Sequence, residues 1–495
     1  MINRAVLCAA VVTLAAVMLA PMAAAQPPQV APPSAAFLHW KDNVARKAVV
    51  MTDDEGHGLG FVPEPHDWSH LSATPLAGDG GFGGAPASYD LRTESGGPYL
   101  TSIRNQGSSG TCWCFASLAS VESNFLMTLA ETWDFSENNI AIQSGFDYDP
   151  LNGGGNTNMS MAYMSRWSGP CWETDDPYGT NGNDPGTGPQ PFRKLVRTMY
   201  VYNTSAEIKD GVMNYGAVTV TMLWDSGDGY NAGTYIFRRT DSIPDGVTGK
   251  DADHLVAIVG WDDTKAHPGG TGCWIVRNSW GTSWGESGYF YIAYDSTDIV
   301  YSITNAWARQ LCGVAPNVGT SNNYYHDPLG QTSGLGFSST TAYAANRFVP
   351  TSNDTLAGVG AYSMEDGTTY DIRIYSTKSG NTFSGQMGTT MTGTWSLAGN
   401  QTVEFPSTIA LTNGDDFYVW IKCVCPSYTY PIATEYPVSG WASPTASANE
   451  SFVSADGSSW ADITSYGGNW ASTNVCLKGL GGSSLPVTVS EFKAE

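Results

Sequence analysis

The stretch QGSSGTCWCFASLASVESNFLMTLAE (106–131) changes character at Cys112. A loop of Gly, Ser and Thr precedes this cysteine, and the residues after it predict a helix with one apolar face, formed by Phe115, Leu118, Ala119, Phe125, Leu126 and Leu129. A thiol at the start of a helix lies near the positive end of the helix dipole, which lowers its pKa and favours the thiolate. Cys112 is therefore a candidate nucleophile. The alternative for a lone cysteine is a buried structural residue or a disulfide partner.

A nucleophilic cysteine needs a base and an oxyanion site. Gln106 precedes Cys112 on the loop, and its side-chain amide together with the Cys112 backbone N–H predicts an oxyanion hole. Three histidines follow Cys112. His267 lies in the predicted turn DDTKAHPGG and His326 in a predicted linker, whereas His254 opens the predicted strand HLVAIVGW (254–261). We expect His254 to be the base because a catalytic group needs a rigid support, the alternative being a buried histidine at a strand end.

A third segment, CWIVRNSWGTSWGESGYF (273–290), supplies an amide that can orient the base. The loop 262–272 is predicted to join two antiparallel strands, which would bring Asn278 beside His254. An amide oxygen that accepts the imidazole N–H fixes the tautomer of the ring without adding a negative charge. Trp280 is expected to shield that hydrogen bond from water. Taken alone, Asn278 would be a turn residue among core tryptophans.

Together the three segments resemble those of papain-family cysteine peptidases. The pattern around the family's cysteine is matched by Gln106, Gly107, Gly110, Cys112 and Trp113, and the Asn-Ser-Trp-Gly-x-x-Trp-Gly pattern is matched throughout 278–285. Asp253 precedes His254 as in the family. The resemblance implies that Cys112 is the nucleophile, His254 the acid and base, Asn278 its orienting partner and Gln106 the oxyanion donor.

The resemblance also implies a substrate cleft. Gly154 and Gly155 resemble the glycines whose backbone pairs with an extended peptide, and Asp253, Leu255 and Trp280 are expected to border that cleft. Departures from the family pattern concern cysteines. Ser109 replaces the first motif cysteine, so the family's disulfide at that point is not expected, and Cys114 is left without an obvious role.

The order of helices and strands predicts an α+β fold for the central region, and the resemblance implies two lobes, one helical and one a β-barrel. Residues after the linker show strand patterns such as TYDIRIY and DFYVWIKC, which predict an all-β sandwich. The resulting division is a signal peptide (1–25), a leader or pro-segment (26–85), a papain-like domain (86–312), a linker (313–327), a lectin-like β-sandwich (328–480) and a tail (481–495). The short leader and the trailing β-domain resemble secreted prokaryotic members of the family.

Composition limits the compartment and the partners. The chain has 495 residues with a formal net charge of -23, which argues against nucleic-acid binding and against docking on anionic lipid. Arg4, the apolar run 5–20 and Ala23-Ala24-Ala25 predict a cleaved signal peptide, so we expect a secreted or cell-surface protein with no stable membrane insertion. Export makes cysteines candidates for disulfide bonds, with one bridge expected among Cys423, Cys425 and Cys476 and a pairing of Cys114 with Cys171 as a guess. No cofactor or metal is expected in the peptidase domain.

The function of the C-terminal domain is less determined by sequence. Its tryptophans could stack on the sugars of cell-surface glycans or form the core: Trp395, Trp420, Trp441, Trp460 and Trp470. Its acidic loop residues, such as Asp354 and Glu365, could hold calcium or lie in solvated turns. Three functions are consistent with these features: a secreted endopeptidase acting on proteins or peptides through a thioester intermediate, an adhesion or glycan-binding protein with a vestigial peptidase domain, and another Cys/His enzyme such as a transglutaminase. The complete set of Cys, His and Asn favours the first.

Overall fold

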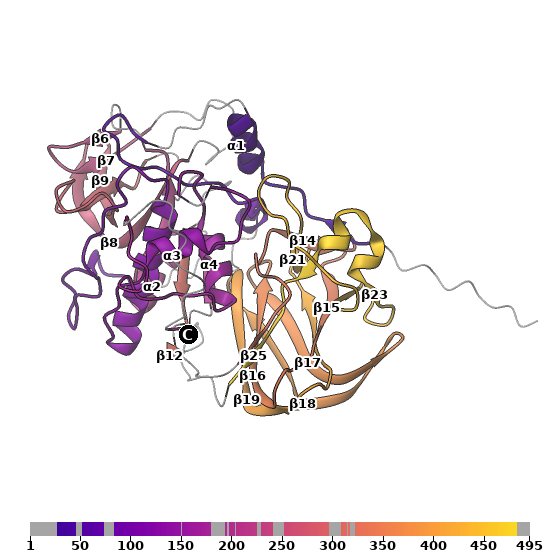
Figure 1. Cartoon of the computed structure of the whole chain (residues 1–495). Helices are drawn as coiled ribbons and strands as arrows, with labels where there is room; N and C mark the ends of the chain where they lie inside the picture. Colours follow the sequence, from indigo (N-terminus) through magenta and orange to yellow (C-terminus); the bar gives the residue numbers. More distant parts are fainter. Residues whose placement is uncertain are drawn as a thin grey trace, which may run out of the picture.

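The computed structural model describes residues 27–45, 52–73, 84–149, 151–179, 194–195, 198–202, 204–224, 229–240, 252–296, 308–313, 315–316 and 322–482. The predicted signal peptide and residues 483–495 of the predicted tail lie outside the described residues. We refer to 27–73 as the leader, to 84–316 as the first domain and to 322–482 as the second domain (Figure 1). The α-helices are α1 Ala35–Ala45, α2 Cys112–Leu129, α3 Glu137–Ile142, α4 Thr157–Ser165 and α5 Ser205–Tyr215.

The central helix of the first domain is α2. Every residue from Cys112 to Phe125 is buried, including polar residues such as Glu122, because α2 packs against strands β8 and β11 and against α3, α4 and α5. The expectation of a single apolar face was therefore wrong: the helix is enclosed on all sides. Its exposed end is apolar instead, with 37% of Leu129 accessible.

Two neighbouring strands of the first domain bring the start of the first strand next to the end of the second. β8 (His254–His267) pairs antiparallel with β9 (Gly270–Arg277), with Ala257 opposite Arg277, so the residue after β9 lies near the start of β8. The stretch predicted as a loop at 262–272 is largely strand, and His267 ends β8 rather than lying in a turn. The same sheet contains β2 Ser88–Asp90, β4 Thr198–Tyr202, β5 Val218–Met222, β6 Tyr230–Asn231, β7 Ile236–Phe237, β10 Tyr289–Ala293 and β11 Ala308–Cys312. A separate pair is formed by β3 Lys194–Leu195 and β12 Ala315–Pro316.

The second domain is a β-sandwich. One layer is the six-stranded sheet β18-β17-β20-β15-β22-β23, and β16, β19 and β25 lie in the other layer. The core between them contains Val359, Ile374 and Val419 among its fully buried side chains. The strands are β13 Asn323–Tyr324, β14 Ser333–Gly336, β15 Thr341–Phe348, β16 Asp354–Ser363, β17 Thr368–Ser379, β18 Thr382–Trp395, β19 Gly399–Leu411, β20 Phe417–Val424, β21 Ile432–Glu435, β22 Ser451–Ser454, β23 Ala461–Asp462, β24 Asn474–Val475 and β25 Lys478–Gly481. Two 3-10 helices, η2 Ile463–Tyr466 and η3 Gly468–Ser472, follow β23.

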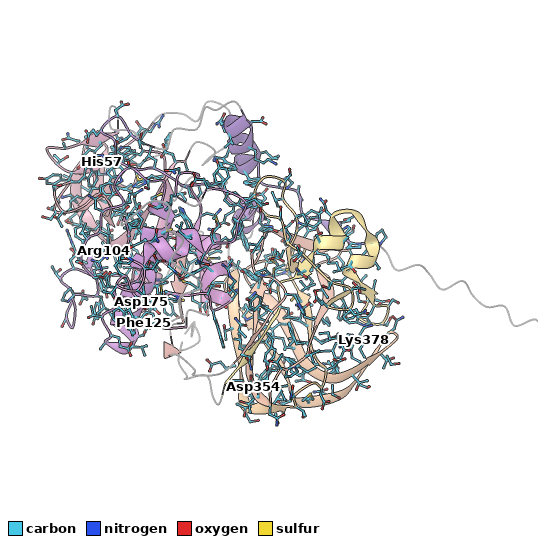
Figure 2. The ribbon with its side chains drawn as sticks, viewed as in Figure 1. His57, Arg104, Phe125, Asp175, Asp354 and Lys378 are labelled. Atoms are coloured by element: carbon cyan, nitrogen blue, oxygen red, sulfur yellow. The ribbon has the colours of Figure 1, made fainter. Side chains whose placement is uncertain are left out.

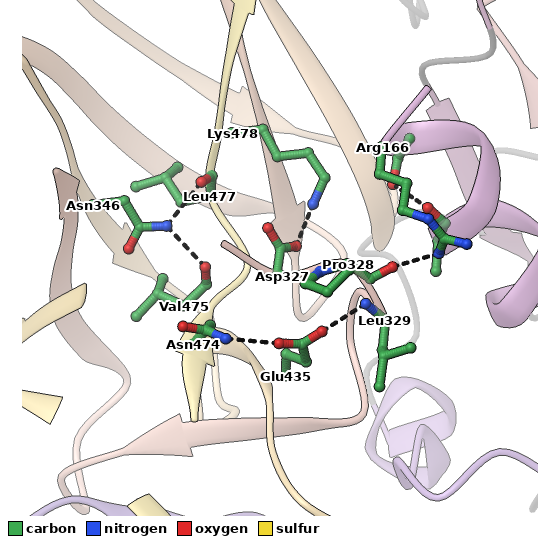
Figure 3. A network of polar contacts seen from close by, with 12 residues as sticks. Arg166, Asp327, Pro328, Leu329, Asn346, Glu435, Asn474, Val475, Leu477 and Lys478 are labelled. Carbon is green, nitrogen blue, oxygen red and sulfur yellow. Dashed lines mark hydrogen bonds and ion pairs between the residues drawn. The ribbon is translucent and has the colours of Figure 1, made fainter. Parts of the chain in front are cut away.

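The two domains are joined by more than the chain between them. β19 of the second domain pairs antiparallel with β4 of the first, so one hydrogen-bonded sheet runs through both domains. Where the chain enters the second domain, Arg166 donates to the Pro328 carbonyl (2.5 Å), and the buried Asp327 pairs with the buried Lys478 (Figure 3). The relative position of the two domains is therefore fixed by the β4–β19 pairing and by the Arg166 hydrogen bond, while the Asp327–Lys478 pair holds the second domain together beside this junction.

Replacing Lys478 by methionine should destabilise the protein strongly, because the Asp327 carboxylate would stay buried without its cation. Loss of one partner of a buried pair costs about 3–5 kcal/mol. We expect a lower melting temperature in calorimetry, largely restored when Asp327→Leu is added. The control Lys422→Met removes a lysine that is only partly buried. An equal loss of stability in that control would contradict the expectation.

The leader is bound to both domains. β1 (Gln29–Val30) adds a strand to β14 of the second domain. In α1, Phe37 and Trp40 lie against Trp441 of the second domain at ring separations of 5.8 and 5.7 Å, and Trp40 also contacts Tyr148 of the first domain. Figure 1 shows α1 above the junction of the two domains. Helix α1 therefore ties the leader to both domains through its aromatic side chains.

Several side chains that were candidates for ligand binding are used internally. Of the five tryptophans considered for sugar stacking, Trp395, Trp420, Trp441 and Trp460 are at most 9% exposed, so they belong to the core, and only Trp470 is partly buried. The Glu365 carboxylate accepts backbone N–H groups of Ser427 and Tyr428, both at 2.8 Å, rather than facing solvent.

The eight described cysteines are all buried, and no disulfide bond joins any two of them. The bridge expected among Cys423, Cys425 and Cys476 is absent. Cys423 packs in the core of the sandwich, and Cys425 and Cys476 pack as thiols in a neighbouring apolar cluster. The guessed pairing of Cys114 with Cys171 is absent as well. Among the described helices, none combines the length and the apolar character needed to cross a membrane.

Candidate active site

Cys112 is the first residue of α2 and is fully buried. Its Sγ accepts the backbone N–H of Leu255 at 3.4 Å. Leu255 is the second residue of β8, so the thiol lies against the beginning of this strand. The start of α2 therefore contacts the start of β8, which places the predicted nucleophile, Cys112, against the residue that follows the predicted base, His254.

His254, the first residue of β8, is held by Asn278 directly after β9. The imidazole Nε2 lies 2.9 Å from Asn278 Oδ1, which also accepts the backbone N–H of Ser279 at 2.8 Å. Because that oxygen can only accept, Nε2 carries the proton and donates. The Trp280 ring stacks on the imidazole with centroids 4.7 Å apart. The antiparallel pairing expected from the sequence thus places Asn278 and Trp280 around His254.

The thiol and the imidazole are not hydrogen-bonded to each other in this structure. His254 Nδ1 is buried with no hydrogen-bond partner. Burial raises the pKa of Cys112 to about 12 and lowers the pKa of His254 to about 4, although the Asn278 hydrogen bond opposes the latter. The expectation that the helix dipole lowers the pKa of Cys112 is wrong for this state, since exclusion of water outweighs the dipole.

Gln106 lies beside this group on the loop before α2. Its Oε1 accepts the Ser279 hydroxyl (2.5 Å), and its Nε2 donates to Ser109 O (2.8 Å). An amide nitrogen carries two N–H groups, so this contact uses one of them. Gln106 is 1% exposed, and Ser279 links it to the loop that carries Asn278.

The site is buried because the leader crosses it. Gly58 N–H donates to Gly107 O, and Gly60 N–H donates to Asp253 O, both at 2.8 Å. Gly155 forms two backbone hydrogen bonds with the leader, donating to Gly60 O and accepting from Val62 N, also at 2.8 Å each. The leader therefore lies extended between Gly155 and Asp253, two of the residues expected to border a substrate cleft.

Two glycines allow the leader to lie this close. A Cβ on Gly58 would be 2.1 Å from Ser109 O, and one on Gly60 would be 2.2 Å from Gly110 O. Both contacts are with backbone atoms of the loop before Cys112, which cannot move aside cheaply. Any other residue at these positions would push the leader away from the thiol.

The leader also covers Trp280 on the face opposite His254. His57 stacks on the Trp280 ring at 4.6 Å, and Trp280 Nε1 donates to Gly58 O at 3.1 Å. His57 Nδ1 lies 3.0 Å from Asp53 Oδ2, which also accepts from Trp224 Nε1. Figure 2 shows the leader residue His57 lying at the first domain, far from Lys378 and Asp354 of the second domain.

Sequence reasoning missed the leader's part in the site. The available signal was the alternation of glycines in HGLGFV (57–62), which is typical of a backbone that approaches another closely. It also missed Arg309 in β11, whose guanidinium lies 2.6 Å from the leader's Glu64. Nothing local marks Arg309, because the strand that carries it is distant from Cys112 in the chain.

Comparison with known proteins agrees with this geometry. Residues 85–315 match the family described as papain family cysteine protease, and residues 323–481 match the family described as lectin like domain. A cysteine protease of Blomia tropicalis is 30% identical over 43% of this chain and 62% of its own length. The cysteine endopeptidase Rep1 of Oryza sativa subsp. japonica is 30% identical over 50% of this chain and 61% of its own. The chain thus spans less than two thirds of these relatives.

A solved structure has the same overall fold. The cysteine protease and lectin-like domains of Cwp84, a surface layer associated protein of Clostridium difficile, superpose with a TM-score of 0.74 at 22% identity. The alignment covers 93% of this chain and 99% of that one. The region 85–315 thus matches the papain family of cysteine proteases by sequence, and the whole chain has the fold of the Cwp84 domains. This chain carries a papain-family peptidase domain followed by a lectin-like domain.

Proposed function

We propose that the protein is a secreted cysteine-type endopeptidase that hydrolyses peptide bonds with a Cys112-His254-Asn278 triad. The observation that carries this proposal is the His254–Asn278 hydrogen bond of 2.9 Å, one residue from the backbone N–H that contacts Cys112 Sγ. Matches to cysteine proteases over the first domain support it.

The roles of these residues follow from their positions. The Cys112 thiolate attacks the scissile carbonyl carbon, and the oxyanion that develops is stabilised by Gln106 and the Cys112 backbone N–H. The imidazolium of His254 then protonates the leaving amine as the C–N bond breaks, which leaves a thioester. Water deprotonated by His254 attacks this thioester and releases the acid and the free thiol. Asn278 keeps the imidazole in the tautomer and orientation that both steps need.

We further propose that residues 26–85 are an inhibitory pro-segment of a zymogen. Backbone pairing of Gly58 and Gly60 with the cleft walls supports this role, because the segment occupies the place of an extended substrate. Contacts of β1 and α1 with the second domain indicate that the lectin-like domain helps to hold the leader. The remaining division into linker (313–327), lectin-like domain (328–480) and tail (481–495) is proposed from the sequence.

The test of the peptidase proposal is digestion of a mixed peptide library by the leader-free protein. We expect cleavage within peptides that is blocked by a thiol-directed epoxide, with the adduct on Cys112 by mass spectrometry. Release of ammonia from glutamine side chains without peptide cleavage would indicate a transglutaminase instead. Glycan binding with no turnover of any peptide would favour the adhesion protein with a vestigial peptidase domain.

Replacing Asn278 by alanine should lower kcat more than it changes KM. The imidazole would lose the only hydrogen bond that the structure gives it, and one such bond with its orienting effect is worth roughly a tenfold to hundredfold change in rate. Steady-state kinetics on a fluorogenic peptide would measure this. Asn278→Asp should recover part of the rate, since it restores an acceptor. Unchanged kcat in the alanine variant would exclude the orienting role.

Acid should favour release of the leader. Burial under the leader lowers the pKa of His254 from its ordinary 6.5 to about 4, so the covered form binds fewer protons than an open form with a solvated imidazole. Burial likewise lowers the pKa of His66 within the leader. As pH falls from about 6.5 to about 4, protonation of His254 should make opening more favourable by up to roughly tenfold per pH unit, and protonation of His66 acts in the same direction. Hydrogen exchange of the amides at 58–62 against pH would show this, with a weaker dependence in His254→Gln.

Secretion and glycan binding remain proposals. The predicted signal peptide supports export, and the second domain's match to a lectin-like family supports a glycan partner. Export of a reporter fused to residues 1–26 tests the first, and a glycan array with the leader-free protein tests the second.

A further inference from the structure

A pocket adjoins the cleft on the side of Gly155 and Leu255. The first domain supplies Thr157, Thr221, Leu255 and Arg309 to its wall, and the leader supplies the rest, including Phe61 and Glu64. Two of the four first-domain residues are threonines and one is leucine, so Arg309 is the single charged group that this domain contributes to the described lining.

The leader neutralises that charge with its own carboxylate. Glu64 Oε2 lies 2.6 Å from Arg309 Nη2, and the side chains are only 8% and 6% exposed. Trp68 Nε1 donates to the same oxygen at 3.0 Å. Among the described lining residues Glu64 is the only acid. His66, which also lines the pocket, is kept neutral by burial, which lowers its pKa well below 6.5.

Departure of the leader leaves Arg309 without its anion. A guanidinium cannot lose its charge at any ordinary pH, and taking it out of water is costly unless an anion faces it. Even with Glu64 in place, Arg309 Nε is buried without a hydrogen-bond partner in the described structure. The fork of N–H groups on a guanidinium is suited to a carboxylate that uses two of them.

The pocket is within reach of a substrate held in the cleft. Gly155 pairs through both its N–H and its C=O with the leader around Phe61, and Leu255 lies both in the pocket wall and against Cys112 Sγ. An extended peptide paired with Gly155 would therefore project one side chain toward Arg309. We propose that Arg309 is a specificity-determining residue and that this pocket takes an aspartate or glutamate side chain of the substrate, in the place that Glu64 fills in the zymogen. This inference rests on the proposed peptidase function.

A simpler role for the Arg309–Glu64 pair is only to anchor the leader. A measured preference for acidic substrates distinguishes the specificity role from this simpler role. A positional library of fluorogenic tetrapeptides is compared for Glu against Gln and for Asp against Asn at each position before the cleaved bond, with leader-free protein. We expect one position at which the acid is preferred by about tenfold or more in kcat/KM. The preference ratio should fall to near one in Arg309→Gln and be partly kept in Arg309→Lys. Arg347→Gln is the matched control, because this arginine pairs with Asp416 in the second domain, and its ratio should equal that of the unmodified protein.

A second measurement does not depend on folding of the Arg309 variants or on turnover. A synthetic peptide of residues 52–73 is titrated onto the leader-free protein by calorimetry, alongside the same peptide with Glu64→Gln. We expect the substituted peptide to bind the unmodified leader-free protein about tenfold more weakly than the natural peptide.

The outcomes distinguish the acidic preference of the pocket from the peptidase function itself. Peptide cleavage without an acidic preference at any position overturns the specificity role of Arg309 while leaving the peptidase intact. Absence of any cleavage overturns the proposed function. The calorimetric comparison then decides separately whether the pocket selects a carboxylate. Equal binding of both peptides to the unmodified protein would show that it does not.

Discussion

Replacing Cys112 by alanine should abolish peptide hydrolysis by the leader-free protein. The thiolate forms the covalent bond on which both halves of the proposed reaction depend, and Cys112 Sγ contacts the backbone N–H of the residue that follows His254. Loss of a catalytic nucleophile costs roughly 10⁴-fold or more in kcat. Initial rates on a fluorogenic peptide, with the detection limit set by enzyme-free hydrolysis, would measure the effect.

The neighbouring thiol provides the matched control. Cys114 is also buried in α2 and lies two residues further along, but it belongs to the apolar packing of the helix. Cys114→Ala should keep most of the activity and lose some stability, because only a small buried side chain is removed. If Cys112→Ala remained active, or if the two variants behaved alike, Cys112 would not be the nucleophile.

Removing the two glycines that let the leader approach the thiol should open the leader. Added Cβ atoms at Gly58 and Gly60 would lie 2.1 and 2.2 Å from backbone oxygens of Ser109 and Gly110. Overpacking of this kind costs about 1–3 kcal/mol at each position. With both glycines changed to alanine, the leader's occupancy of the cleft should fall by roughly a hundredfold or more.

The measurement is the rate at which iodoacetamide alkylates Cys112 in the unprocessed protein. A His254→Ala background prevents self-cleavage, so the leader remains attached and alkylation reports only its opening. The control is Gly84→Ala, since no atom lies within 4 Å of a Cβ at that position of the proposed pro-segment. Equal alkylation rates in the double variant and in the control would show that the leader does not guard the thiol.

The candidate catalytic residues could be predicted because each of them lies in a short segment with a recognisable pattern. A Gly/Ser loop turning into a helix marks Cys112, a strand start marks His254, and the antiparallel return of that strand brings Asn278 to the imidazole at 2.9 Å. Strand patterns likewise predicted the β-sandwich at the C-terminus. These features depend on residues close in sequence or on one hairpin, so periodicity and turn residues carry the information.

The protonation state of the site could not be predicted from those segments. Whether the thiol ionises depends on how much water reaches it, and the leader that excludes water is more than 45 residues earlier in the chain. The same limit applies to the cysteines, which pack as small apolar groups, and to the tryptophans of the second domain, four of which are core.

Sequence by itself predicted the class of chemistry, since a thiol, an imidazole and an amide in these local settings indicate a cysteine nucleophile with an oriented base. Only the tertiary structure decided what covers these groups. The leader's backbone between Gly155 and Asp253, the sheet shared through β4 and β19, and the pairing of Arg309 with Glu64 all join residues far apart in the chain. Such contacts arise from packing and from the need of buried charges for partners, and no local pattern in the sequence encodes them.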